Sequence, residues 1–325
     1  MRCAMFYVSF SVLVAVHAQP AASWTEYLRG GDSLNSFGRM LEARGQYERA
    51  LHEASLVPGH EQLQAVILSK LAGVEIDLGR LENAAPLCQR AISILVKVSE
   101  EADLRVQTLR IELAGLYLQS GQNTTAEKLL RSIFKLQAGQ HQIAGPEVAF
   151  ALDVLACLHA SKRKWRSAEA AERRALSLLE AVPTPHEAAT AIASLHLSIV
   201  LNWQKRPAEA LPYAVYAKEL LRGLSMPQPA MDASASASLA SIYVGIRRWP
   251  DAQIESERAI QTVLSLYGPD HPKTAWILLA HAATLRRMGR KQEARVFQRR
   301  GERILRENDK DYLGETVPIE ALLSR

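Results

Sequence analysis

The segment LASIYVGIRRWPDAQIESERAI, residues 239–260, decides the fold, because it recurs in degraded form along the chain. It opens with a Leu-Ala pair, passes through a short polar stretch and reaches a second alanine twelve residues after the first, so that Ala240 is followed by Ala252. Small residues at both positions let two antiparallel helices approach closely, while leucines fill the neighbouring positions. The segment therefore predicts a helix, a tight turn and a second helix.

The same pair of small residues returns at a fixed spacing. Its second member stands at positions 50, 84, 126, 168, 210, 252 and 294, so the first step is 34 residues and each later step is 42. A fixed period of this length is typical of a solenoid built from stacked supersecondary units. The predicted repeat-packing residues are Gly38, Ala50, Ala72, Ala84, Ala114, Ala126, Ala156, Ala168, Ser198, Ala210, Ala240, Ala252, Ala282 and Ala294.

The composition supports an all-helical chain. The chain has 325 residues, of which 48 % are hydrophobic and only 6 % aromatic. Alanine and leucine dominate the apolar residues, and both favour helices over strands. A chain of this length and apolar content can bury a sizeable core.

The pattern resembles the tetratricopeptide repeat over about residues 32–307, and LAGLYLQSGQNTTAEKLL (113–130) also carries the resemblance. The 42-residue period and the segment YGPDHPKTA (267–275) are similar to the kinesin-light-chain type of this repeat. The resemblance implies an all-α fold, a right-handed α-α superhelical solenoid of about seven helix-turn-helix units. It also implies a non-enzymatic scaffold that binds a partner polypeptide in the concave groove lined by the first helix of each unit.

Glycine and proline mark the predicted helix ends. Gly45, Gly79, Gly121 and Gly289 fall in the predicted turns, where a residue with positive φ ends a helix at little cost. Pro272 falls in the first turn of a predicted helix, where its missing N–H is not needed. Asp270 is then expected to cap that helix and His271 to be a boundary residue rather than a ligand.

The resemblance also implies a set of groove residues that would face a partner. The kinesin light chains place paired asparagines before the Leu-Ala pair, whereas this chain has Asp153-Val154 and Leu195-His196 there. The resemblance therefore implies a protein-binding groove, but it does not imply that the partner is a kinesin cargo. The predicted partner-groove residues are Asp153, His196, Asn202, Trp203, Trp276, Arg286 and Arg287.

The chain lacks the common motifs for catalysis, nucleotides and metals: GxGxxG, GxxxxGK[ST], HExxH and GxSxG are absent. Cys88 and Cys157 lie in no metal-binding spacing, and we expect both to be buried as small apolar residues. Glu172 and Glu255 stand among arginines and predict a solvated face. We therefore expect no catalytic, cofactor or metal site, while an enzyme with an unrecognised site stays an alternative.

Two basic runs keep a nucleic-acid-binding solenoid open as a second alternative. They are KRKWR (162–166) and RRMGRKQEARVFQRRGERILRE (286–307). We favour a structural interpretation, because the last helix of a solenoid needs a polar outer face and the net charge of the chain is only +5.

The chain ends predict export and a short tail. Residues 1–18, MRCAMFYVSFSVLVAVHA, have a positive start, an apolar run and small residues at the end, as in a cleaved secretory signal. We expect a periplasmic or secreted protein with no membrane span after cleavage, and an uncleaved anchor is the alternative. Residues 19–31 form a short N-terminal segment, and residues 308–325 a C-terminal cap or tail.

Overall fold

The computed structural model describes residues 23–36, 39–98, 103–138, 145–183, 186–225 and 227–307. Within these ranges the chain is helical and contains no strand. The predicted signal, the predicted tail and the packing residue Gly38 lie outside the described residues. The helices are α1 (Ser23–Ser36), α2 (Met40–Ser55), α3 (Glu61–Asp77), α4 (Leu81–Val98), α5 (Leu104–Gln119), α6 (Asn123–Ala138), α7 (Gly145–Ser161), α8 (Trp165–Glu180), α9 (Glu187–Trp203), α10 (Pro207–Gly223), α11 (Pro229–Gly245), α12 (Trp249–Tyr267), α13 (Pro272–Arg287) and α14 (Lys291–Glu307).

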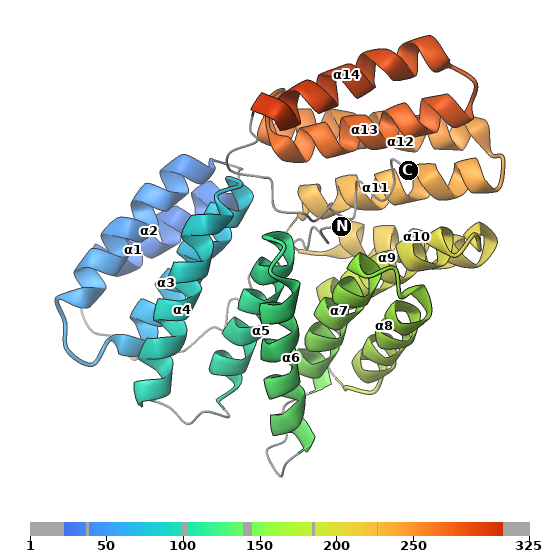
Figure 1. The fold of residues 1–325 in the computed structure, drawn as a ribbon. Coiled ribbons are helices and arrows are strands. Elements are labelled where there is room, and N and C mark those ends of the chain that lie inside the picture. The colour runs from blue at the N-terminus through green and yellow to red at the C-terminus, as the bar shows by residue number, and fades with distance from the viewer. Residues whose placement is uncertain are drawn as a thin grey trace.

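Successive helices pair as hairpins, from α1 with α2 to α13 with α14. Each even-numbered helix also packs on the next odd-numbered one. From α5 onward the odd-numbered helices contact one another as well. They therefore form the inner layer of a curved stack and the even-numbered helices form the outer layer (Figure 1). This confirms the predicted right-handed superhelical solenoid.

The small residues of the repeat lie at the helix contacts. Every described member of the predicted repeat-packing set is at most 1 % exposed. On the outer helices the buried face follows these positions at helical spacing, as in α12, where Ala252, Ser256, Ala259 and Val263 are buried. The inner helices are buried on almost every side, as in α9, where all residues from Ala193 to Leu201 are buried. The inner layer is therefore held by neighbours on three sides.

Six hairpin turns share one geometry. A residue with φ between 56° and 82° follows each of the six inner helices from α3 to α13, and the next residue closes a hydrogen bond back over the turn. For example, Arg248 N donates to Tyr243 O at 2.8 Å. This is the Schellman pattern of helix ends. The residues with positive φ are Gly79, Gly121, Arg163, Lys205, Arg247 and Gly289.

The first hairpin differs from the prediction. The chain turns between α1 and α2, and Gly45 lies inside α2 rather than in a turn. Helix α1 already begins at Ser23, ahead of the predicted start of the repeats at residue 32. The reason is that the first unit departs from the 42-residue spacing, so the positions of the later units cannot be transferred to it.

The start of α13 confirms one expectation and corrects another. Pro272 is the first helical residue, as predicted. The capping residue, however, is His271, whose Nδ1 accepts a hydrogen bond from the Lys273 backbone N–H at 3.1 Å. Asp270 instead lies 3.5 Å from the Arg303 guanidinium. His271 is therefore a structural residue at a helix boundary.

The superhelix curves far enough to bring its second hairpin into contact with its last. Lys273 Nζ at the start of α13 lies 2.9 Å from Asp77 Oδ1 at the end of α3. In Figure 1 one end of the α13 and α14 hairpin accordingly lies near one end of the α3 and α4 hairpin. Among the described helices, none has both the length and the apolar character needed to cross a membrane.

Candidate functional site

The inner layer contains an apolar pocket between four successive inner helices. Its volume is about 160 Å³. Val66 of α3, Leu109 of α5, Phe150 of α7 and Ile192 of α9 form its walls. We call this cavity the apolar pocket. Since each of these four helices contributes a wall, the pocket exists only because the repeats are stacked.

Three carboxylates lie in the wall of the apolar pocket: Glu112, Glu147 and Asp153. Glu112 accepts a hydrogen bond from Ser69 Oγ at 3.3 Å, and burial raises its pKa to about 7. Burial also raises the pKa of Glu147. Asp153 is only 3 % exposed and faces His196 and Glu172. The pocket is therefore mainly apolar, with three carboxyl groups in its wall.

Two cations also line the apolar pocket, and both form ion pairs within the chain. Lys70 Nζ lies 2.8 Å from Asp32 Oδ1. The Arg105 guanidinium lies 2.6 Å from Asp103 Oδ2. The pocket wall therefore carries side chains of both charges.

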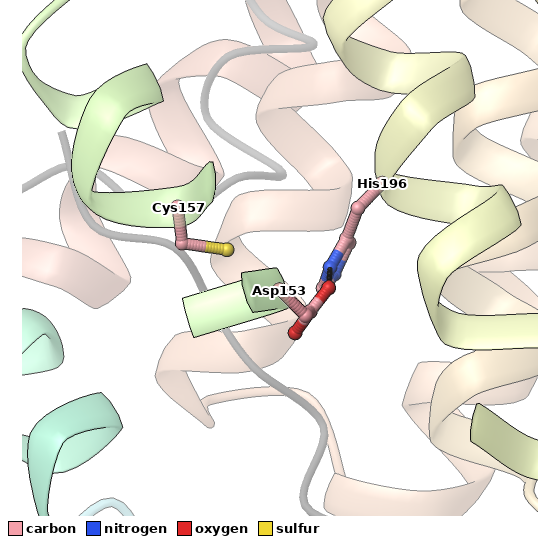
Figure 2. Close-up of side chains that lie close together, drawn as sticks. All are labelled: Asp153, Cys157 and His196. Carbon is pink, nitrogen blue, oxygen red and sulfur yellow. Dashed lines mark hydrogen bonds and ion pairs between the residues drawn. The ribbon is translucent and has the colours of Figure 1, made fainter. Parts of the chain in front are cut away.

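Behind this wall, α7, α8 and α9 enclose a buried cluster of Asp153, Glu172 and His196. His196 Nδ1 and Asp153 Oδ1 are 2.5 Å apart, and Figure 2 shows the two side chains in contact. Glu172 Oε1 lies 3.8 Å from the same nitrogen. Burial, and then the charge of Asp153, raise the pKa of Glu172 well above its ordinary value. The environment of the cluster therefore favours the protonated form of Glu172.

Cys157 lies one helical turn after Asp153 on α7 and faces the same space (Figure 2). Ligand atoms of Asp153, Cys157 and His196 all lie within 4.8 Å of one another. The contact of 2.5 Å between Asp153 and His196 is a hydrogen bond. Two ligands at about 2.0–2.2 Å from one metal ion would stand further apart. The arrangement is that of a buried polar pair rather than a formed metal centre.

The sequence analysis was wrong about Glu172, which is fully buried instead of solvated. A signal for this was present in the sequence. Glu172 lies four residues after Ala168 and three before Ala175, which places it on the packed face of α8. Glu255 is also partly buried, and it forms an ion pair of 3.1 Å with Lys218 Nζ.

A second pocket, the polar pocket, lies at the carboxyl ends of α9, α11 and α13. Its volume is about 230 Å³, and Asn202, Trp203, Lys205 and Arg287 line it. Asn202 Nδ2 donates a hydrogen bond to Ser241 Oγ at 2.9 Å. The Trp203 ring stacks on that of Trp165, with the ring centres 5.4 Å apart. This pocket carries two cations and no carboxylate.

The predicted groove residues divide between these places. Asn202, Trp203 and Arg287 line the polar pocket, and Asp153 lines the apolar pocket. His196 lies in the buried cluster. Trp276 on α13 is partly buried, and Arg286 is exposed; neither lines one of these two pockets. Whether these residues contact a partner stays a prediction.

Comparisons with known proteins agree with this architecture. Residues 231–307 match the sequence profile described as tetratricopeptide repeat. The protein KINESIN LIGHT CHAIN-RELATED 1 of Arabidopsis thaliana is 22 % identical over 254 residues, which cover 78 % of this chain and 41 % of the relative. This chain thus spans about two fifths of the length of that relative.

Two solved structures share the fold. A Rap protein in complex with competence and sporulation factor has a TM-score of 0.71 and 16 % identity, with 90 % of this chain and 77 % of that chain covered. The Rap conjugation gene regulator of plasmid pLS20, in complex with the Phr* peptide, has a TM-score of 0.70 and 16 % identity, with coverage of 92 % and 80 %.

The stacked hairpins define an α-solenoid, and folds of this type are typically non-enzymatic scaffolds. Residues 231–307 carry tetratricopeptide repeats, and the 42-residue period of the chain is similar to that of the kinesin light chains.

Proposed function

We propose that this protein is a non-enzymatic scaffold that binds a segment of a partner polypeptide in its concave groove. The single observation that carries the proposal is the apolar pocket, to which α3, α5, α7 and α9 each contribute a wall. An apolar cavity on an inner helical surface suits a side chain of an extended or helical segment. One similar solved structure holds the Phr* peptide and another holds a competence and sporulation factor, which supports the same use here.

The two alternatives have less support. The buried cluster joins a histidine to two carboxyl groups, but His196 and Glu172 are at most 3 % exposed and line neither pocket, which leaves a substrate little access to them. Two arginines of the last basic run pair with acids, Arg290 with Glu293 and Arg303 with Glu307. Arginines paired in this way are less available for phosphate contacts.

Export is part of the proposal and rests on the sequence of residues 1–18 alone. Intact-mass analysis of the protein from its own host tests it. A mature chain that begins at Gln19 supports a cleaved signal, and a chain that retains residues 1–18 contradicts it.

The groove is tested by filling the apolar pocket. A random peptide library displayed on phage is selected on the immobilised protein, and the affinity of a selected peptide is measured by fluorescence anisotropy. The substitution Thr108→Trp places a bulky ring in the pocket wall and is expected to weaken binding by about tenfold or more.

The matched control is Thr124→Trp, which adds the same ring at an exposed position of α6 on the outer layer. It is expected to leave the affinity unchanged. Equal affinities for both variants, with both folded by circular dichroism, would place the binding surface elsewhere.

A further inference from the structure

The polar pocket at the carboxyl ends of α9, α11 and α13 has the chemistry of a binding site for an anion. We propose that the bound segment carries an aspartate or glutamate whose side-chain carboxylate lies in the polar pocket, against Lys205 and Arg287. This inference rests on the proposed function, since the occupant belongs to the same partner segment, and it adds the chemistry of that segment.

The charges in the wall of the polar pocket favour a carboxylate. Lys205 follows α9 and Arg287 ends α13, and both are exposed and line the pocket. Within the part of the chain that the structure describes, neither cation forms an ion pair, and no aspartate or glutamate lines the pocket. Lys205 Nζ lies instead over the Trp203 ring, 6.0 Å from its centre. Two cations in one cavity without an acid partner attract a carboxylate of a ligand.

The uncharged groups of the polar pocket suit the same ligand. Asn202 Nδ2 donates a hydrogen bond to Ser241 Oγ, and both residues line the pocket. Because Ser241 Oγ is the acceptor in this contact, its own hydroxyl proton can be donated to a ligand oxygen. The Trp203 ring is held by its stack on Trp165 and forms an aromatic wall of the pocket. The pocket therefore offers a neutral donor in addition to the two charged ones.

The backbone at Lys205 indicates that its side chain serves a purpose other than the turn. Lys205 has a φ of 64°, which costs free energy for residues other than glycine. Glycine stands at the equivalent position of three other hairpin turns, as Gly79, Gly121 and Gly289. A lysine at this position weakens the turn, and its contact with a bound carboxylate gives the side chain a role that glycine cannot fill.

Helix α9 contributes to both pockets and sets the spacing between the partner residues that fill them. Ile192 lines the apolar pocket, and Trp203 lines the polar pocket. The two residues are eleven positions apart, so they share one face of α9 and lie about 16 Å apart along its axis. An extended chain crosses this distance in about five residues. The acidic residue should therefore lie about five positions from the apolar residue that fills the apolar pocket.

The experiment compares two random peptide libraries on the immobilised full chain, one complete and one without aspartate and glutamate. Both are displayed on phage as fusions without a free carboxyl terminus, so only a side chain can supply a carboxylate. Binders from the complete library are expected to carry an acidic residue about five positions from a large apolar one. Replacing that acidic residue by its amide in a synthetic peptide should weaken binding by about fivefold, and high salt should remove most of the difference.

Substitution of Lys205 tests the same contact from the side of the protein. Lys205→Gly should weaken binding of the acidic peptide by about fivefold and leave the affinity of its amide form unchanged. It should also raise the melting temperature, because glycine relaxes the turn. The matched control is Arg163→Gly, which relaxes the equivalent turn after α7 and lies outside the polar pocket. This control should raise the melting temperature and change neither affinity.

Arg287 provides an independent second variant. Arg287→Gln should weaken binding of the acidic peptide by about fivefold, whereas Arg299→Gln, which removes an exposed arginine of the outer helix α14, should not. A cation near the carboxyl end of a helix also stabilises that helix, so thermal melts accompany both measurements. A lower melting temperature of Arg287→Gln with an unchanged affinity would assign Arg287 to the helix end and overturn the inference.

The outcomes separate this inference from the proposed function. Peptides that are blocked by Thr108→Trp but show no preference for acidic residues would overturn the inference and leave the groove as the binding site. Acidic peptides whose affinity is unchanged by both Lys205→Gly and Arg287→Gln would also overturn it. Failure of both libraries to yield peptides that are blocked by Thr108→Trp would overturn the proposed function itself.

Discussion

Lys273 Nζ lies 2.9 Å from Asp77 Oδ1, although the two residues are 196 positions apart in the chain. Lys273 also lies over the Tyr267 ring, 4.9 Å from its centre. The contact joins α3 to α13 and therefore closes the superhelix across the groove. The curvature of the solenoid and the shape of its inner surface are thus linked to one partly exposed ion pair.

Reversing the charge of Lys273 with Lys273→Glu should open this contact with little loss of stability. An ion pair that is partly exposed contributes about 0.2–1 kcal/mol. Spin labels on α3 and α13 should report a longer or broader distance distribution in the variant. Adding Asp77→Lys restores an ion pair of opposite orientation and should restore the wild-type distances. Unchanged distances in the single variant would show that packing alone sets the curvature.

Two of the hairpin turns should be stabilised by glycine. Arg163 and Arg247 adopt φ values of 56° and 63°, where glycine has no steric cost. Each of Arg163→Gly and Arg247→Gly is expected to raise the free energy of unfolding by about 0.5–1 kcal/mol. The reciprocal change Gly121→Arg, at the equivalent turn, should lower it by a similar amount. Chemical denaturation measures all three, and a loss of stability in both glycine variants would contradict the turn geometry.

A small residue is required where the helices of a hairpin meet. Ala168 is fully buried on α8, so Ala168→Leu should overpack the hairpin and cost about 1–3 kcal/mol. Ala170 is exposed on the same helix, and Ala170→Leu should change the stability by less than about 0.5 kcal/mol. Thermal melts compare the two, and equal effects would argue against close helix contact at Ala168.

His271 should make the protein sensitive to acid. Burial, and then the charge of Lys273, lower the pKa of His271 from its ordinary 6.5 to about 3. Between these two pKa values the unfolded chain binds a proton that the folded chain does not, so stability falls as the pH drops below about 6.5. His271→Asn keeps a capping acceptor without titrating.

The variant should therefore lose less stability than the wild type between pH 7 and pH 4, by about 1–3 kcal/mol. Urea denaturation at both pH values measures the difference. Parallel pH profiles for the two proteins would show that the histidine ring is protonated in the folded state.

The sequence predicts most of the fold, because the small residues that reveal the hairpins in the sequence are also the residues at which the helices pack. Ala252 and Ala294 could be identified from spacing alone, and both are buried at helix contacts. Gly45 could not be placed correctly, because its unit departs from the 42-residue period. The contact of Asp77 with Lys273 depends on small rotations summed over several repeats, which no local pattern specifies.

The site was only partly predictable for a related reason. Asp153 and His196 could be assigned to neighbouring inner helices, but their direct contact depends on how those helices are rotated. Glu172 was missed because charge suggested exposure, while its spacing from Ala168 indicated burial. Where the two signals disagree, the packing period is the better guide in a solenoid.

Site-specific photocrosslinking tests the central claim most directly. A photoreactive amino acid is placed at Val66 in the wall of the apolar pocket or at Val296, which is 66 % exposed on the outer helix α14. A peptide selected on the protein should crosslink at Val66 and not at Val296. Crosslinks at Val296 without any at Val66 would contradict binding in the concave groove.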